Sequence, residues 1–224
     1  MQSQEVAAGI CGLIAVTASG YVSLSVAFEF AVGALIVWRL WVGVGYVLQS
    51  GLFFTPSCMQ GEFRGGVYLF KAFVGPYRES AKECTKVIDA AKKAKLSRWS
   101  TVCIYLDNPQ KVPESECRYT VGALLKKSDK SAETVYKNEG YALRSLPTVP
   151  AGITEHPFHG VLSVLLASRK VYPMLTTFSI EQGLKEEELG PFLEECVFTK
   201  DQTSWSRLRY YAPLQQNPEF RLVT

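Results

Sequence analysis

The sequence predicts an α+β domain whose two similar halves share one antiparallel sheet, preceded by an N-terminal membrane helix. The first observation is an apolar N-terminal stretch with almost no charge. The second is an amphipathic helix pattern flanked by short strand-like runs, and the third is a longer helical pattern followed by a closing hairpin. Helices interspersed with several short strands are typical of mixed helix-and-sheet domains.

The N-terminal stretch is long enough to cross a bilayer. Between Val6 and Leu48 the only charged residues are Glu29 and Arg39. A span needs about 20 apolar residues, and a charge near the bilayer centre is costly, so these two residues limit the possible registers. One span covers about 6–28 and leaves both charges near the interface. Another covers about 28–48 and tolerates Arg39 inside, whereas a hairpin of two spans leaves too few residues for its turn.

The flanking charges predict which way the span points. No Lys or Arg precedes the apolar run, and the run is longer than the core of a cleaved signal peptide, which favours a signal-anchor. Positive charge lies on the C-terminal flank, so the rest of the chain is expected in the cytosol. We therefore divide the chain into an anchor (1–48), a linker (49–66), a domain (67–214) and a short tail (215–224).

Composition argues against several classes of function. Lys and Arg alternate with Asp and Glu instead of forming a basic stripe, so nucleic acid is not an expected partner. The six cysteines form no CxxC pair, and His156 and His159 are the only histidines. This pattern predicts neither a metal site nor a cofactor. We expect no catalytic residues, because no nucleophile elbow and no phosphate-binding loop is present.

The first half of the domain reads as strand, helix, strand, strand. Val67–Val74 is rich in β-branched and aromatic residues, and Gly75-Pro76 ends it. From Tyr77 the apolar positions recur every three or four residues, which predicts an amphipathic helix ending near Lys95. Further strands are expected over 100–106 and 117–125, and Asp107-Asn108-Pro109 reads as a turn between them.

The second half reads as a strand, a long helix and a hairpin. A short helix capped by Ser131 precedes a strand over 141–146, and Pro147, Pro150 and Gly152 predict a loop. Helical spacing over 158–183 surrounds Pro173, which is expected to kink or restart the helix. The stretch 185–188 is expected to be a solvated loop, and 193–198 with 208–212 forms the hairpin.

Four stretches resemble the GyrI-like domain of the testis-expressed protein 264 family. They are YVLQSGL at 46–52, GPYRES at 75–80, YLDNP with the following VP and CRYTVGALL over 105–125, and LSVLLASRKVYP at 162–173. Together they cover about 46–214 in the order found in that family. The resemblance implies two βαββ repeats around a cleft, one span, and a cytosolic domain on the endoplasmic reticulum membrane. It also implies a receptor for reticulophagy, and it favours the span nearer the domain.

The resemblance implies Atg8-like proteins as partners beside the lipid bilayer. Family members carry the Atg8-binding motif in a long acidic tail, which this sequence does not show after 215–224. The motif is an aromatic residue, two residues, then Leu, Ile or Val, added to the partner's sheet as a strand. Phe220 and Val223 fit this spelling, which makes them the candidate Atg8-binding residues. A membrane adaptor without Atg8 binding is the alternative that the missing tail leaves open.

The family cleft gives a second alternative, a small-molecule-binding or hydrolytic domain. GyrI-like domains that bind or hydrolyse ligands often place a Glu in the cleft from the strand after the long helix. Alignment on Asp201-Gln202 places Cys196 there, and a slip of one residue places Glu195 there. Our cleft candidates are Tyr105, Arg118 and Glu195, although Arg118 is also well placed to pair with Asp107.

Overall fold

The computed structural model describes residues 24–198 and 205–220, and the chain divides after Gln49 into two compact units. The described part of the first unit is helix α2 (Leu24–Gln49). Within it, Phe28–Gln49 is long and apolar enough to cross a membrane, with a mean hydropathy of 1.8. This stretch coincides with the 28–48 register, whereas most of the 6–28 register lies outside the described residues. Arg39 lies inside it, with its guanidinium 5.5 Å from the Trp38 ring centroid.

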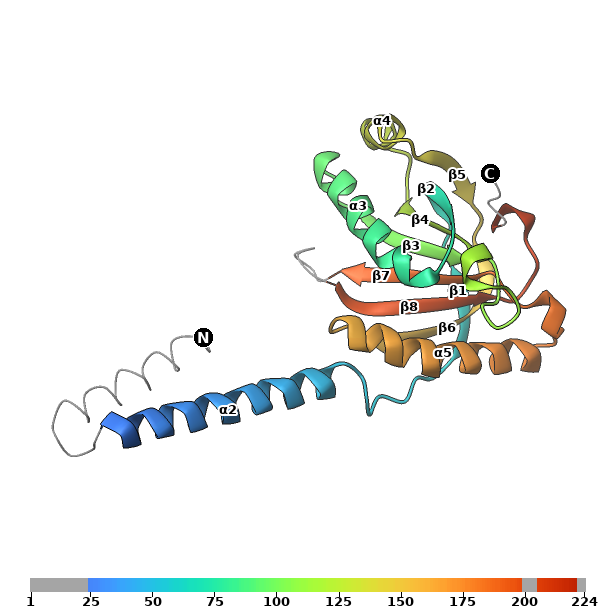
Figure 1. The fold of residues 1–224 in the computed structure, drawn as a ribbon. Helices are drawn as coiled ribbons and strands as arrows, with labels where there is room; N and C mark the ends of the chain where they lie inside the picture. Colours follow the sequence, from blue (N-terminus) through green and yellow to red (C-terminus); the bar gives the residue numbers. More distant parts are fainter. Residues whose placement is uncertain (1–23, 199–204, 221–224) are drawn as a thin grey trace. The chain divides into compact units, whose positions relative to one another are not determined.

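The second unit is an α+β domain built on one antiparallel sheet of eight strands (Figure 1). The order across the sheet is β1-β6-β8-β7-β3-β4-β2-β5. The strands are β1 (Met59–Phe63), β2 (Gly66–Val74), β3 (Trp99–Tyr105), β4 (Arg118–Leu125), β5 (Ala142–Leu146), β6 (Val149–Pro157), β7 (Phe192–Phe198) and β8 (Trp205–Pro213).

The predicted internal repeat is confirmed by the topology. The first repeat is β2, α3 (Ser80–Lys93), β3 and β4, and the second is β6, α5 (Val161–Glu181), β7 and β8. In both repeats the last strand lies between the other two, and β3 pairs with β7 to join the halves. Two further strands extend the edges, since β1 pairs with β6 and β5 pairs with β2. The α+β class and the shared antiparallel sheet are therefore both as predicted.

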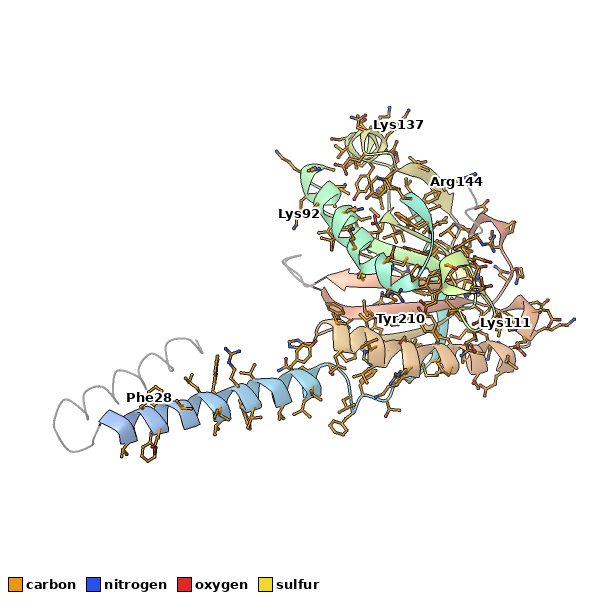
Figure 2. All side chains as sticks on the ribbon, viewed as in Figure 1. Phe28, Lys92, Lys111, Lys137, Arg144 and Tyr210 are labelled. Carbon is orange, nitrogen blue, oxygen red and sulfur yellow. The ribbon has the colours of Figure 1, made fainter. Side chains whose placement is uncertain are left out.

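The helices present one apolar side to the sheet. On α3, Cys84, Val87 and Ala91 are buried against β3 and β4, while α5 packs on β6 and β8. Lys92 on α3 and Lys137 on α4 (Lys130–Asn138) point away from the sheet into solvent (Figure 2). This division follows from the helical periodicity of the apolar residues.

The loop predicted around Pro147, Pro150 and Gly152 is wrong, because most of it belongs to β6. This strand pairs on both sides, with β1 and with β8. Proline and glycine are poor strand residues, which hid the pattern. Gly152 has a packing role that periodicity cannot show, since a Cβ there would lie 2.7 Å from Cδ1 of Phe178 on α5. The first strand of the second repeat is therefore β6, and β5 is an added edge strand.

Four other local details differ from the prediction. The lead-in contains strand β1. Asp129 caps α4 in place of Ser131, because its side chain accepts hydrogen bonds from the backbone N–H groups of Ser131 and Ala132. Helix α5 continues through Pro173, whose position on the exposed side leaves the interrupted backbone bond open to solvent. A short 3₁₀ turn, Glu186–Glu188, lies in the stretch expected to be a loop.

The sheet has two faces of different character. One is covered by α3, α4 and α5 and buries residues such as Cys103, Tyr105 and Tyr210. The other is uncovered by these helices, and its core includes Phe63, Ile104 and Leu193. We call these the helix face and the inner face. Because side chains alternate along a strand, neighbouring residues of β3, β7 and β8 belong to opposite faces.

Candidate functional site

Two consecutive glutamates of β7, Glu194 and Glu195, mark the two chemically distinctive places in the domain. Glu194 lies opposite Cys103 of β3 and Tyr210 of β8, both of which belong to the helix face. Glu195 lies opposite Val102 and Arg209, on the inner face. One strand therefore presents a carboxyl group to each side of the sheet.

Glu194 is surrounded by aromatic side chains from both repeats. Tyr105 of β3 hydrogen-bonds to its carboxyl group, and Tyr172 of α5 and Tyr210 of β8 lie close enough to interact with it electrostatically. The rings of Tyr172 and Tyr210 pack edge-on, with centroids 5.8 Å apart. The Tyr105 hydroxyl also contacts Ser80 Oγ at 3.1 Å, which links the group to the start of α3. Residues from four elements thus converge on one carboxyl group.

This setting changes the chemistry of Glu194. Loss of solvation by burial raises the pKa of Glu194 to about 7, although the hydrogen bond from Tyr105 acts in the opposite direction. A carboxyl group with this pKa exchanges its proton near neutral pH. Part of its surface still reaches solvent. When ionised, it offers a negative charge beside aromatic faces, which is a combination suited to an organic cation.

Buried thiols lie on the same face beside Glu194. Cys84 Sγ of α3 is 3.4 Å from Cys103 Sγ of β3, and Cys196 belongs to the adjoining cluster. Contact with Cys84 and burial raise the pKa of Cys103, so its thiol stays protonated at neutral pH. No group of three or more His, Cys, Asp or Glu suited to a metal ion occurs among residues 24–198 and 205–220. The thiols pack as small apolar groups.

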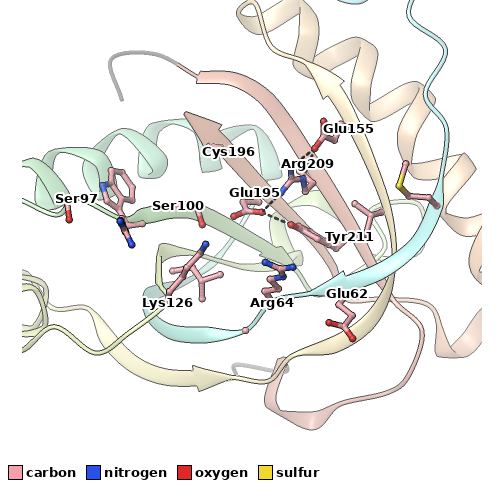
Figure 3. Close-up of a pocket in the computed structure, with 16 residues that line it drawn as sticks. Glu62, Arg64, Ser97, Ser100, Lys126, Glu155, Glu195, Cys196, Arg209 and Tyr211 are labelled. Atoms are coloured by element: carbon pink, nitrogen blue, oxygen red, sulfur yellow. Dashed lines mark hydrogen bonds and ion pairs between the residues drawn. The ribbon is translucent and has the colours of Figure 1, made fainter. Parts of the chain in front are cut away.

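On the inner face, Glu195 belongs to a row of charges that opens into a hollow of about 830 Å³ (Figure 3). Arg209 lies directly across from Glu195 on one side and from Glu155 of β6 on the other. Its Nε donates to Glu155 Oε1 at 2.7 Å, and its Nη1 lies 3.8 Å from Glu195 Oε2. The Tyr211 hydroxyl donates to Glu195 Oε2 at 2.6 Å. Each carboxylate therefore has a cross-strand partner.

The partners in this row fix its charge state. Burial works against the charge of Arg209, but hydrogen bonding with Tyr211 and Glu155 outweighs it and raises the pKa of Arg209. Burial likewise opposes ionisation of Glu155, yet Arg209 and Arg207 hold the pKa of Glu155 below its ordinary value. Glu155 and Arg209 are therefore both charged at neutral pH and pair with each other in the wall of the hollow.

The opening of the hollow is lined by exposed cations. Arg64, Arg98 and Lys126 line it, and none of the three forms an ion pair within the part of the chain that the structure describes. Arg64 and Lys126 point toward the space above Glu195 (Figure 3). Exposed Lys and Arg side chains are well solvated by themselves. The hollow therefore combines charged side chains at its opening with apolar walls that include Leu124 and Ile153.

The structure places the three cleft candidates in three separate locations. Tyr105 belongs to the helix face beside Glu194, whereas Glu195 lines the hollow on the inner face. Arg118 lies at the start of β4, where it binds Asp107 through Nε at 2.9 Å and Nη2 at 2.7 Å. That pairing is the structural role considered for Arg118 in the sequence. The candidates do not form one site.

The residue that joins Tyr105 is Glu194, which the sequence alignment passed over. The alignment offered Cys196 or Glu195 for the strand after the long helix. Cys196 does belong to the helix face, and strand alternation puts Glu194, two residues earlier, on that same face. The alternation of side chains along β7 was the signal that could have identified Glu194, because it lies two residues before Cys196.

The Atg8-binding candidates differ in what the structure shows. Phe220 is 0% exposed, and its ring packs 5.7 Å from that of Phe63 on the inner face. It cannot enter a partner's groove while the turn Pro218–Phe220 stays in the domain core. Val223 lies outside the described residues.

Comparison with known proteins finds similarity to curated sequences from human and mouse. It is 25% identical over 196 residues to human testis-expressed protein 264, and 26% identical over 196 residues to the mouse homologue. The matches cover 84% of this chain. The chain is therefore similar to testis-expressed protein 264 over most of its own length. It spans 58% of the length of the human relative and 59% of the mouse one. No family model matches the sequence.

Solved structures identify the fold of the soluble domain. The crystal structure of the EcmrR C-terminal domain superposes with a TM-score of 0.50 at 14% identity, over 70% of this chain and 96% of that one. EcmrR in its cryo-EM complex with DNA gives a TM-score of 0.51 at 14% identity, over 95% of this chain and 79% of that one. The domain therefore has a GyrI-like fold, and an apolar N-terminal helix precedes it in the chain.

Proposed function

We propose that this protein is anchored in the endoplasmic reticulum membrane and acts in reticulophagy through a cytosolic GyrI-like domain. The observation that carries the proposal is the similarity to testis-expressed protein 264 combined with an apolar helix directly before the domain in the chain. The sequence supports the orientation, because the basic residues near the span lie on its C-terminal side. The role is that of a binding protein, and no catalytic step is assigned to it.

Membrane topology is the first test, because every part of the proposal depends on it. The full chain, tagged at both ends, is treated with protease in intact and in detergent-opened microsomes. We expect the C-terminal tag to be cleaved in intact microsomes and the N-terminal tag only after detergent. A protected C-terminal tag, or release of the protein by alkaline carbonate, contradicts the proposal.

Direct binding of Atg8-like proteins is the second test. Because Phe220 is part of the core, the informative substitution is Val223→Ala, with Gln215→Ala as an exposed control. If the chain is a receptor that uses this motif, an Atg8-like protein pulls down the wild type and Gln215→Ala. It does not pull down Val223→Ala. If the wild-type chain is not retained, direct receptor activity is rejected for this chain and the adaptor without Atg8 binding replaces it.

Glu194 and its tyrosines favour a second function, the binding of a small organic cation. A carboxyl group that ionises near neutral pH gains a counter-ion, and the aromatic faces add cation–π contact. The probe is benzyltrimethylammonium, and the readout is the thermal midpoint of the full chain in detergent at pH 8. We expect the probe to raise the midpoint of the wild type and of Glu195→Gln but not that of Glu194→Gln. An equal rise in all three excludes this site.

A further inference from the structure

The residues that follow the membrane helix are held firmly by the domain. Ser50 and Gly51 are buried, and the Phe54 backbone N–H donates to the Gly51 carbonyl at 3.1 Å, which closes a turn. The turn has a φ of +90° at Gly51, a backbone conformation that favours glycine. We call residues 51–54 the juxtamembrane turn.

Lys170 of α5 fastens this turn to the domain. Its ammonium donates to the carbonyls of Gly51 at 3.2 Å, Leu52 at 2.5 Å and Phe54 at 2.9 Å. A lysine ammonium has three N–H donors, so the turn uses all of them. Charge-assisted bonds to neutral carbonyls are stronger than ordinary ones, and they satisfy three backbone acceptors at once.

His156 of β6 fixes the turn from a second direction. A Cβ on residue 51 would lie 2.5 Å from Cε1 of the His156 ring, so only glycine fits against it. The Phe54 ring packs edge-on against the same imidazole, with centroids 5.5 Å apart. Burial lowers the pKa of His156, so the ring is neutral at physiological pH. The turn is therefore clamped by residues from two separate elements.

Held in this way, the turn presents apolar side chains outward. Phe53 is 77% exposed, while Leu52 and Phe54 are each 39% exposed. The chain gives these side chains a defined neighbour, because the stretch able to span the bilayer ends at Gln49. Four residues reach at most about 14 Å, so Phe53 cannot lie far from the lipid headgroups. Apolar and aromatic side chains at that depth are favoured by partial burial between headgroups.

We propose that the juxtamembrane turn inserts Leu52 and Phe53 into the lipid interface, and that Lys170 and His156 transmit this contact so that the whole domain is held against the membrane surface. The inference rests on the proposed membrane anchoring of the chain. It adds that residues 51–54 are fixed to the domain by Lys170 and His156. The exposed side chains of the juxtamembrane turn contact lipid headgroups and not another protein.

Photocrosslinking to lipid tests the insertion. The full-length protein is reconstituted in phosphatidylcholine vesicles with a benzophenone amino acid at Phe53, or at the exposed residues Val74 and Leu143 as controls. We expect the yield of lipid adducts at position 53 to exceed that at the control positions by about fivefold or more. A chain that resists carbonate but gives equal yields at all three positions overturns the inference and leaves the anchoring intact. A chain that carbonate releases fails the anchoring and the inference together.

Fluorescence energy transfer from the domain to the bilayer tests whether Lys170 and His156 hold the domain close to the membrane. A donor fluorophore near Leu143 and acceptor-labelled lipids report the distance between domain and membrane. Lys170→Met removes the hydrogen bonds that hold the juxtamembrane turn, so we expect a lower transfer efficiency in this variant. Lys127→Met is the control, because it removes an exposed lysine that does not contact the turn. Gly51→Ala is an independent way to release the turn, and circular dichroism shows whether each variant is folded. Unchanged transfer in both folded variants overturns the role of Lys170 and His156.

Discussion

Glu194 and Glu195 are neighbours in the chain, but their surroundings have opposite chemistry. Glu194 faces the helices among tyrosines, and burial raises its pKa to about 7. Glu195 faces the hollow, accepts a hydrogen bond from Tyr211, and lies across from Arg209. One residue along a strand therefore separates a carboxyl group poised to change charge from one that is part of a paired network.

The difference comes from what covers each face. Helices α3 and α5 bring aromatic and apolar side chains over Glu194, and they supply no cation within the described residues near it. On the inner face, the register of β6, β7 and β8 sets Glu155, Arg209 and Glu195 in one cross-strand row. Coverage by helices thus isolates one carboxyl group, and strand register pairs the other.

The largest effect on the free energy of unfolding is expected for Phe220, in the core of the inner face. Phe220→Ala removes a fully buried ring that packs on Phe63, and it should lower the free energy of unfolding by about 3–5 kcal/mol. Urea unfolding of the full chain in detergent measures this, with the exposed neighbour Glu219→Ala as a control. A change as small as the control's would mean that the 218–220 turn leaves the core in solution, and Phe220 would again be available to a partner.

Glu194→Gln tests the isolation of the helix-face carboxyl group. The folded protein keeps the Glu194 proton up to about pH 7, whereas the unfolded chain releases it near the ordinary glutamate pKa of 4.5. Stability at this position is therefore fully present below pH 4.5 and is lost as the pH rises to about 7. Gln cannot ionise, so at pH 8 the variant should be more stable than the wild type by up to about 3 kcal/mol.

Urea unfolding at pH 4 and pH 8 measures this dependence, with Glu195→Gln as the matched control. The Glu194→Gln advantage should vanish at pH 4, where both states of the wild type hold the proton. Glu195→Gln should be destabilising at pH 8, because it weakens the contacts with Tyr211 and Arg209. A pH-independent effect of Glu194→Gln would show that Glu194 is ionised and solvated in the folded protein.

The fold was more accessible to sequence reasoning than the site. All nine helices and strands predicted within the domain are present, and the periodicity that predicted them was strong, as in α3 and β4. Strand β6 was missed because Pro150 and Gly152 are poor strand residues, and only the packing of Phe178 explains why glycine is needed. Strand β1 was missed because its residues, MQGEF, show little apolar alternation.

The sequence analysis chose Glu195, which is one position away from Glu194, the carboxyl group on the helix face. In a strand, a register error of one residue transfers every side chain to the other face, so choosing Glu195 instead of Glu194 selected the hollow instead of the helix face. The sequence alone could not settle this, because both residues are glutamate and both sides of β7 are partly buried. Tyr105 was predicted as a cleft residue and lies on the helix face, whereas its neighbour Tyr172 was assigned no role.

Tyr211→Phe tests the paired network with a smaller expected effect. The substitution removes the hydroxyl that donates to Glu195 at 2.6 Å and keeps the ring that packs 5.2 Å from that of Phe63. A hydrogen bond to a carboxylate that is partly exposed contributes about 1–2 kcal/mol. The double-mutant cycle with Glu195→Gln isolates this coupling, and Tyr210→Phe on the helix face serves as the control. Full additivity of Tyr211→Phe and Glu195→Gln would show that the pair is not coupled.

The smallest effect is expected for Arg118→Met, at the start of β4, where an exposed guanidinium pairs with the mostly buried carboxylate of Asp107. The Arg118 side chain is 51% exposed, so its bidentate contact with Asp107 should contribute only about 0.5–1 kcal/mol. Arg118 holds the pKa of Asp107 below its ordinary value, so this contribution is present at neutral pH and is lost as the pH falls below about 3.8. Urea unfolding should therefore show a smaller wild-type advantage at pH 3 than at pH 7. A loss as large as that of Phe220→Ala would mean that this ion pair contributes as much to the stability of the domain as a fully buried aromatic ring.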